Sequence, residues 1–151
     1  MHEIYAFQYI MDIPLLIPDN RNILDLKDLL DFHFKSEIIE FEAKCLNCDK
    51  ISIQEKKLKI SHPPILTMQR LYANLNTKNN CLIKIKELLD ISDYIDKDCF
   101  NNTVILYDLY GVVNHIGSLS RGHYYTFIKI FDKNIWYKFN DVFNFLLFSK
   151  N

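Results

Sequence analysis

The sequence has no marked excess of charge of either sign. Its 18 Lys and Arg residues stand against 19 Asp and Glu residues, which gives a formal net charge of -1 at pH 7. Proteins that bind nucleic acids or anionic membranes usually carry a basic patch that shows in the net charge. We therefore expect neither a nucleic acid nor a membrane as a partner.

Long apolar runs and a targeting segment are also lacking. No run approaches the roughly 20 apolar residues that span a bilayer. The opening residues, Met1-His2-Glu3, do not start a secretory signal peptide, which needs a basic region followed by an apolar one. We expect a cytoplasmic or nuclear protein whose four cysteines stay reduced, namely Cys45, Cys48, Cys81 and Cys99.

The spacing of the four cysteines does not match a complete zinc site of the common kind. A structural zinc ion needs four ligands, and the pair Cys45-x-x-Cys48 supplies two of them. Cys81 and Cys99 are distant from this pair and from each other in the sequence. The sequence therefore predicts no cofactor requirement and at most half of a metal site, Cys45 and Cys48.

The patterning of apolar residues predicts a single α+β domain over 1–151. A chain of this length buries about 70% of the surface that its unfolded form exposes, which is enough for a core. Apolar residues between Pro14 and Pro18 indicate a short strand, and helical spacing indicates a helix over 23–35 with Asn22 as its N-cap. Strands are predicted, mostly antiparallel, over 38–43, 51–60, 65–72, 82–89, 104–114, 122–131 and 134–139.

Glycine is rare, and all three glycines fall between Gly111 and Gly122. This concentration indicates one region that needs backbone freedom or a close approach by another chain. His123 follows the last glycine at the start of a strand. If the next hairpin turns midway between Phe131 and Asp132, His123 and Asn140 face each other, and Asp141 points to the other face of the sheet.

A histidine oriented by an asparagine is part of a Cys-His-Asn acyl-transfer triad. In such a triad a thiolate attacks a carbonyl, the histidine moves the proton and the asparagine holds the imidazole ring. The same pair also fits an ordinary hairpin in which a half-buried histidine is satisfied by a neighbouring amide. The spacing of His123 and Asn140 alone leaves both interpretations open.

The order of several motifs resembles the ubiquitin-specific protease family, the papain-like cysteine deubiquitinases. Gly-His-Tyr-Tyr at 122–125 is similar to the family's histidine box, and Ile-Trp-Tyr-Lys-Phe-Asn-Asp at 135–141 to its Trp-x-x-Phe-Asn/Asp-Asp segment. Residues 89–95 resemble its Leu-Asp-Leu-x-x-Tyr stretch, and 63–71 its Leu-Pro-x-x-Leu-x-x-x-Leu-x-Arg-Phe strand, with Leu71 in place of the usual Phe. The likeness spans nearly the whole chain.

The resemblance implies a role for each residue of these motifs. His123 would be the general base, Asn140 the third triad member, and Asp141 a supporting polar group. The loop from Gly117 to Gly122 would flank the channel for ubiquitin's C-terminal Gly-Gly tail, and Tyr124 would line that channel. The implied fold is a papain-like palm with part of the fingers, over 1–72 with the one Cys-x-x-Cys and over 82–151 with the histidine box.

The family's nucleophile, a cysteine in a Gly-Asn-x-Cys context at the head of a helix, has no counterpart in this sequence. The resemblance therefore implies the C-terminal half of a deubiquitinase without the helical thumb lobe, with ubiquitin or ubiquitinated proteins as partners beside the missing Cys-bearing half. A second cysteine pair upstream would complete a zinc site. The alternatives are a ubiquitin-binding pseudoenzyme and, disfavoured by charge and ligand number, a zinc ribbon that binds nucleic acid.

Overall fold

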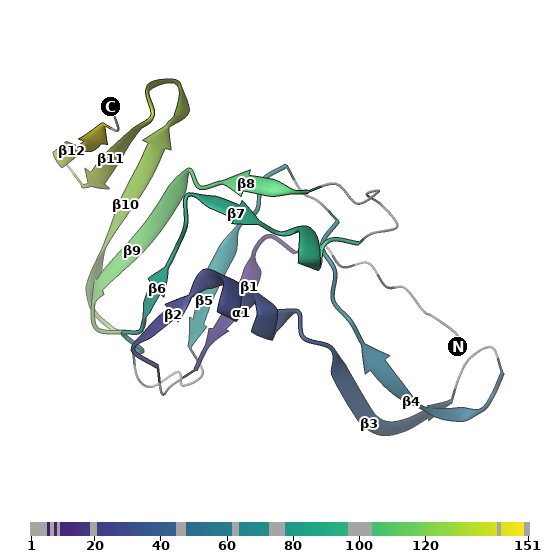
Figure 1. The fold of residues 1–151 in the computed structure, drawn as a ribbon. Coiled ribbons are helices and arrows are strands. Elements are labelled where there is room, and N and C mark those ends of the chain that lie inside the picture. Colours follow the sequence, from purple (N-terminus) through teal and green to yellow (C-terminus); the bar gives the residue numbers. More distant parts are fainter. Residues whose placement is uncertain are drawn as a thin grey trace.

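The computed structural model describes residues 6, 8, 10–18, 21–44, 48–61, 64–72, 78–96, 104–141 and 143–149. Of residues 40–43, 52, 71–72 and 143–149 it describes the backbone. This part of the chain is rich in strands and holds one α-helix and two 3-10 turns, which agrees with the predicted α+β class (Figure 1). In chain order the elements are β1 (Ile13–Ile17), β2 (Ile23–Asp25), α1 (Leu26–His33), β3 (Glu37–Lys44), β4 (Ile51–Lys56), β5 (Met68–Tyr72), β6 (Leu82–Lys84), β7 (Leu88–Asp90), η1 (Ser92–Tyr94), β8 (Leu106–Asp108), β9 (Gly111–Gly117), β10 (Gly122–Ile130), η2 (Phe131–Lys133), β11 (Ile135–Asn140) and β12 (Phe143–Ser149).

The largest sheet has four antiparallel strands in the order β12-β11-β10-β9. The pairs β3-β4 and β7-β8 are also antiparallel, and the β3-β4 hairpin projects away from the rest of the molecule (Figure 1). The arrangement is thus mostly antiparallel, as predicted, while the pairs β1-β5 and β2-β6 are parallel. Both parallel pairs join segments far apart in the sequence. Local hydrophobic patterns do not predict which distant strands pair.

The helix begins three residues later than the sequence pattern predicts. Residues 23–25 form β2 instead, because they pair with β6, and the amide of Leu82 donates to the carbonyl of Asn22 at 2.8 Å. The N-cap is therefore Asp25, whose side chain accepts from the amide of Lys27 at 3.0 Å, and not Asn22. Long-range strand pairing overrides the local helical spacing at this end.

Two predicted strands are each divided in two. The segment 82–89 forms β6 and β7, and 104–114 forms β8 and β9, so that each break lets the chain change partner strands. The predicted strands over 51–60 and 65–72 are real but shorter, as β4 and β5. The strand β12 was not predicted. No helix in the described part of the chain has the length and apolarity needed to cross a membrane.

One hydrophobic core fills the region between β1, α1 and η1. Strand alternation turns Ile13, Leu15 and Ile17 of β1 inward, and helical spacing brings Leu26, Leu29 and Leu30 of α1 against them. Ile17, Leu30 and Ile91 are the largest fully buried side chains of the described residues. The other members of this core are Ile60, Cys81, Tyr94, Ile95 and Ile105.

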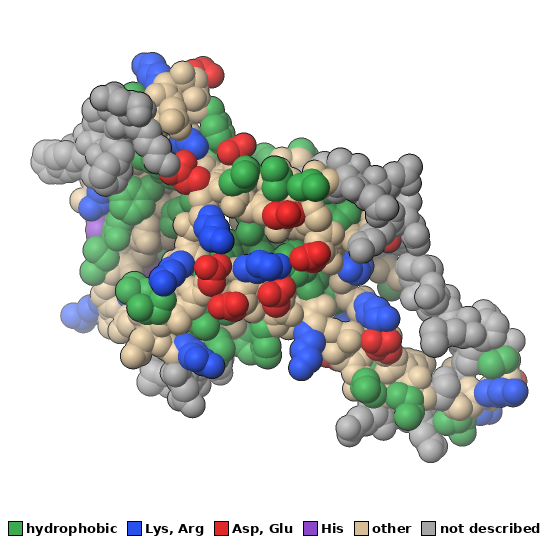
Figure 2. Space-filling view, viewed as in Figure 1, with side chains coloured by type: hydrophobic (Ala, Val, Ile, Leu, Met, Phe, Trp, Pro, Cys, Tyr) green, Lys and Arg blue, Asp and Glu red, His purple; other side chains and the backbone are tan. Residues whose placement is uncertain are grey.

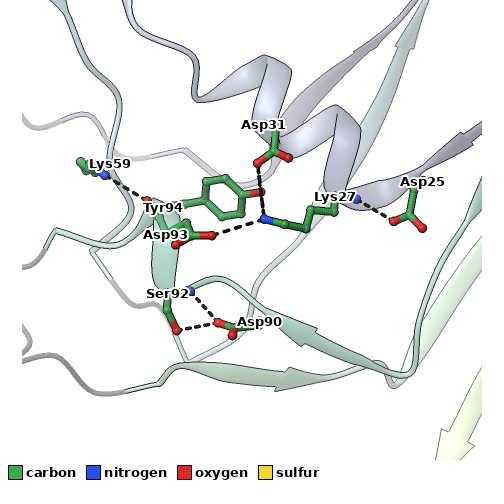
Figure 3. Close-up of polar contacts among 8 residues, drawn as sticks. All are labelled: Asp25, Lys27, Asp31, Lys59, Asp90, Ser92, Asp93 and Tyr94. Carbon is green, nitrogen blue, oxygen red and sulfur yellow. Dashed lines mark hydrogen bonds and ion pairs between the residues drawn. The ribbon is translucent and has the colours of Figure 1, made fainter.

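A polar cluster fastens α1 to η1 at the surface of this core (Figure 3). The hydroxyl of Tyr94 donates to Asp31 Oδ1 at 2.6 Å, and Lys27 Nζ lies 3.2 Å from that hydroxyl. Lys27 Nζ also lies 3.4 Å from a carboxylate oxygen of Asp31 and 3.4 Å from one of Asp93. Burial, followed by the hydrogen bond to Asp31, raises the pKa of Tyr94 to about 12, so its hydroxyl stays a donor. Figure 2 shows basic and acidic side chains gathered over this part of the face.

Candidate functional site

His123 is the second residue of β10, in the hairpin that β10 forms with β11. The register pairs Ile130 with Ile135 and Thr126 with Phe139, so the loop consists of residues 131–134. It contains the 3-10 turn η2 and ends at Asn134, which has a φ of 49°. Continued along the strands, this register sets Asn140 level with Tyr125. The Phe-Asp-Lys-Asn segment does form the turn, but its centre lies between Asp132 and Lys133, one residue later than predicted. The predicted direct pairing of Asn140 with His123 is therefore wrong.

His123 and Asn140 nevertheless meet, as diagonal neighbours on one face of the sheet. The Nε2 atom of His123 and the Oδ1 atom of Asn140 are hydrogen-bonded. Because alternate residues of a strand share a face, His123 and Tyr125 lie on the same side, and a diagonal neighbour is within reach of an imidazole. An amide oxygen only accepts, so Nε2 carries the hydrogen and Nδ1 of the neutral ring keeps a lone pair.

Asp141 also lies beside His123, which corrects the prediction that it points to the opposite face. Its Oδ2 atom is 3.5 Å from His123 Nδ1. Asp141 has a φ of 49°, a left-handed conformation that ends the strand and breaks the alternation of side chains. The structure thus places Asn140 and Asp141 beside the two nitrogens of the His123 imidazole. The His123 side chain remains 45% exposed.

The two glycines predicted for the substrate channel are cross-strand partners at the turn end of the β9-β10 hairpin. Gly117 has a φ of 111°, where a Cβ atom would meet the carbonyl oxygen of Arg121 at 2.6 Å. A Cβ atom on Gly122 would lie 1.9 Å from His115 Nε2 and 2.6 Å from the carbonyl oxygen of Ile116. The amide of Ser118 donates to the carbonyl of Arg121 at 2.8 Å and closes the turn. Both positions therefore require glycine.

Tyr124 is not brought together with His123. Successive residues of a strand point to opposite faces, so the Tyr124 side chain lies on the face away from the imidazole. It is 65% exposed, and its ring lies 4.5 Å from the ring of His115, its cross-strand partner, between centroids. Its role in lining a channel stays a prediction.

The cysteines do not form a metal centre among the described residues, where no three His, Cys, Asp or Glu side chains gather. Cys48 is exposed and Cys81 is buried, and both are free thiols. Cys45, the other half of the predicted Cys45-Cys48 pair, lies outside the described residues, as does Cys99. Of the predicted pair the structure thus describes Cys48, and the half-site at Cys45 and Cys48 stays a prediction.

Two residues outside the predicted site contact the Gly117–Gly122 turn. His115 packs on Tyr124 and over Gly122, a position that the β9-β10 pairing around the turn could have indicated. Lys78 Nζ donates to the carbonyls of His115 at 3.0 Å and Gly117 at 2.7 Å. Lys78 lies in a polar linker between predicted strands, and no pattern in the sequence indicates its contact.

Comparison with known families gives a match over most of the chain. The family model described as "Ubiquitin carboxyl-terminal hydrolase" matches residues 19–143. Ubiquitin carboxyl-terminal hydrolase 8 of Saccharomyces cerevisiae is 32% identical over an alignment of 144 residues that covers 87% of this chain and 30% of that protein. Ubiquitin carboxyl-terminal hydrolase 16 of Arabidopsis thaliana is 34% identical over an alignment of 139 residues that covers 87% of this chain and 13% of that protein.

Solved structures of similar fold include a SAGA DUB module that contains Ubp8, Sgf11, Sus1 and Sgf73. The match has a TM-score of 0.75 at 29% identity and covers 91% of this chain and 32% of the matched chain. A second structure of such a module, bound to monoubiquitin, matches with a TM-score of 0.75 at 29% identity and covers 91% of this chain and 31% of the other. The chain thus spans about a third or less of the length of these relatives.

Proposed function

Because the chain belongs to the ubiquitin carboxyl-terminal hydrolase family, we propose that it is the base-carrying part of a deubiquitinase. The proposed reaction is hydrolysis of the isopeptide or peptide bond after the C-terminal glycine of ubiquitin. The observation that carries the proposal is the hydrogen bond between His123 Nε2 and Asn140 Oδ1 on a hairpin that ends in Asp141. Ubiquitin or a ubiquitinated protein is the proposed partner.

In this proposal His123 is the general base and Asn140 fixes its ring. With the hydrogen on Nε2, the lone pair of Nδ1 takes the proton of a cysteine thiol, and the thiolate attacks the carbonyl carbon of the last glycine. The carbon–nitrogen bond breaks as the imidazolium returns the proton to the leaving amine. Water, deprotonated by Nδ1, then hydrolyses the thioester. Asp141, 3.5 Å from Nδ1, would stabilise the imidazolium between these steps.

The proposal assigns the nucleophilic cysteine to a segment outside these 151 residues. Cys81, for comparison, belongs to the buried core around Ile17 and Ile91, and Cys48 follows β3 on the projecting hairpin. We further propose that the β3-β4 hairpin corresponds to fingers and that 82–151 corresponds to a palm, with the helical thumb supplied by the same outside segment. Zinc would bind at Cys45 and Cys48 only where a second cysteine pair is supplied from upstream.

The test uses ubiquitin whose C-terminus carries a thiol-reactive group. The chain is compared with a version extended upstream through any Gly-Asn-x-Cys segment of the gene. Only the extended protein is expected to form the covalent adduct. Its turnover of a ubiquitin–amine conjugate should fall about 100-fold to 10,000-fold on His123→Ala, the range for loss of a general base.

The matched control is His33→Gln, which changes a histidine on α1 and should leave turnover unchanged. Equal loss in both variants would contradict the assignment of His123. If no such extension exists and the chain binds ubiquitin without labelling, the protein is a ubiquitin-binding pseudoenzyme. The catalytic roles of His123 and Asn140 then fail.

A further inference from the structure

The outer edge of β9 ends beside the Gly117–Gly122 turn. Ser118 and Arg121 are joined by a backbone hydrogen bond, so the pairs Gly117–Gly122 and His115–Tyr124 are the non-bonded pairs of the antiparallel ladder. In such pairs the carbonyls point away from the partner strand. On an edge strand these groups have no backbone partner, and they are open to water or to another chain.

Lys78 occupies this edge. Its ammonium group donates to both outward carbonyls, those of His115 at 3.0 Å and Gly117 at 2.7 Å. An ammonium group has three hydrogen-bond donors and no acceptor, so it can donate to both carbonyl oxygens at once. Hydrogen bonds from a charged donor are stronger than those between neutral groups. The conformation of the turn is therefore tied to Lys78 as well as to its own strand pairing.

Lys78 is itself anchored to the core through the next residue. The Asn79 side chain donates to the carbonyl of Pro18 at 3.1 Å and accepts from the amide of Cys81 at 2.8 Å. Cys81 is buried and Pro18 directly follows the buried strand β1. The segment 78–81 therefore connects the core to the tip of the β9-β10 hairpin, which lies next to the start of β6 (Figure 1).

On the face of the sheet, His115 supports the same turn. Its ring lies over Gly122, where any Cβ atom would collide with it, and it packs on Tyr124. The turn is thus held at its edge by an ammonium group and on its face by an imidazole. Lys78 thus contacts the backbone of the turn, and His115 packs against Gly122 and Tyr124.

We propose that Lys78 is a positioning residue that holds the Gly117–Gly122 turn in the conformation that receives the C-terminal tail of ubiquitin. This inference rests on the proposed function for the identity of the tail. An edge strand with free carbonyls and a glycine at each side of its turn would otherwise sample other conformations. Lys78 removes that freedom through hydrogen bonds to the backbone carbonyls of His115 and Gly117.

The first measurement is amide hydrogen exchange in the chain with Lys78→Met, which keeps an unbranched side chain one atom shorter and removes its donors. The exchange of the Ser118 amide is expected to quicken roughly fivefold to tenfold, the effect of losing one charged hydrogen bond of modest strength. Lys86→Met is the matched control, because Lys86 is an exposed lysine near β6, and it should change nothing. Lys78→Arg should retain most of the protection. Unchanged exchange at Ser118 in Lys78→Met would overturn the inference.

The second measurement separates positioning of the tail from general stability. Affinity is measured for ubiquitin and for ubiquitin that lacks its last two glycines. Lys78→Met should weaken binding of the full-length form about threefold to tenfold and leave binding of the shortened form unchanged. An equal loss for both forms, or no loss for either, would contradict a role in positioning the tail.

The two proposals fail in different ways. If the unmodified chain binds neither form of ubiquitin, or both equally, the proposed recognition of the tail fails. Hydrogen exchange in Lys78→Met still decides whether Lys78 orders the turn in that case. If the unmodified chain prefers full-length ubiquitin and Lys78→Met keeps that preference, the proposed function stands and the role of Lys78 is wrong.

Discussion

The core region around β1 and α1 and the four-stranded sheet are held together by different means. The core region contains all of the buried hydrophobic side chains found in the described residues. In the sheet, none of the residues 111–141 is buried to that degree. The sheet is instead held by strand pairing, tight turns and the ion pair of Lys129 with Glu87 at 3.1 Å. The candidate site lies wholly in this second region, so backbone pairing and turn geometry decide its shape.

The sheet also carries large apolar side chains on one face. Val113 is 68% exposed, and Tyr124, Ile128, Ile130 and Phe139 share its face by strand alternation and register. The core region has no comparable uncovered face in β1, where alternate residues are buried. Such a surface favours association. We therefore expect the isolated chain to be poorly soluble or to self-associate.

The largest expected difference in stability between the two regions comes from truncating a buried side chain of the core region. Leu30→Ala should lower the free energy of unfolding by about 2–5 kcal/mol, because Leu30 is fully buried. Val113→Ala in the sheet should cost no more than about 0.5 kcal/mol, because that side chain is mostly in water. Urea titration of both variants measures the difference. Similar losses in the two variants would refute the contrast between the regions.

The next largest effect concerns the turn of the sheet. Gly117→Ala should cost about 1–3 kcal/mol, because alanine is strained at a φ of 111° and its Cβ atom meets the Arg121 carbonyl. Gly111→Ala is the matched control, since its Cβ atom would have only an ordinary contact with the Phe127 carbonyl, at 3.8 Å. Exchange of the amides in 115–123 should rise in Gly117→Ala alone. Equal exchange in the two variants would show that the turn tolerates a side chain.

A smaller effect is expected from the polar cluster on the core region. Tyr94→Phe removes the hydroxyl that donates to Asp31 and lies beside Lys27, and it should lower stability by about 0.5–1.5 kcal/mol. Tyr110→Phe, an exposed tyrosine next to β9, serves as the control. Thermal melting of the two variants compares them. If Tyr94→Phe melts at the same temperature as the unmodified chain, packing alone joins α1 to η1.

The smallest effect is a dependence of stability on pH at the end of α1. Burial, and after it the charge of Lys56, lowers the pKa of His33, and the Pro14 carbonyl and the Glu37 carboxylate act in the opposite direction. The unfolded chain therefore binds the proton more readily than the folded chain. Stability should fall as the pH drops through and below the ordinary histidine range. His33→Gln should flatten this part of the profile, measured by urea titration from about pH 7.5 to 5.5.

The sequence predicted which residues come together at the site more accurately than it predicted their register and side-chain directions. The approach of His123 to Asn140 was predicted correctly, because both residues lie on one hairpin and hairpins are local. The register was wrong, because the four-residue loop, with Asn134 in a left-handed conformation, is centred one residue later than predicted. The place of Asp141 was also wrong, because one positive φ reverses the direction of a side chain.

The start of the helix and the parallel strand pairs could not be predicted from local patterns. The apolar spacing continues through Ile23, and only the pairing of β2 with β6 turns that residue into a strand. The contacts of Lys78 with His115 and Gly117 could not be predicted either, because they join residues nearly 40 positions apart. Propensity and capping act over a few residues, and they carry no information about such partners.

The sequence by itself determined the class of the fold, the hairpin that carries His123 and Asn140, and the glycines at 117 and 122. These features depend on residues close together in the chain and on backbone conformations that few residue types allow. Only the tertiary structure decided which strands pair in parallel, which nitrogen of His123 faces each polar neighbour and how Lys78 closes the edge of β9. Those features depend on ångström-scale register between distant segments, which is settled when the core packs and the backbone hydrogen bonds are satisfied.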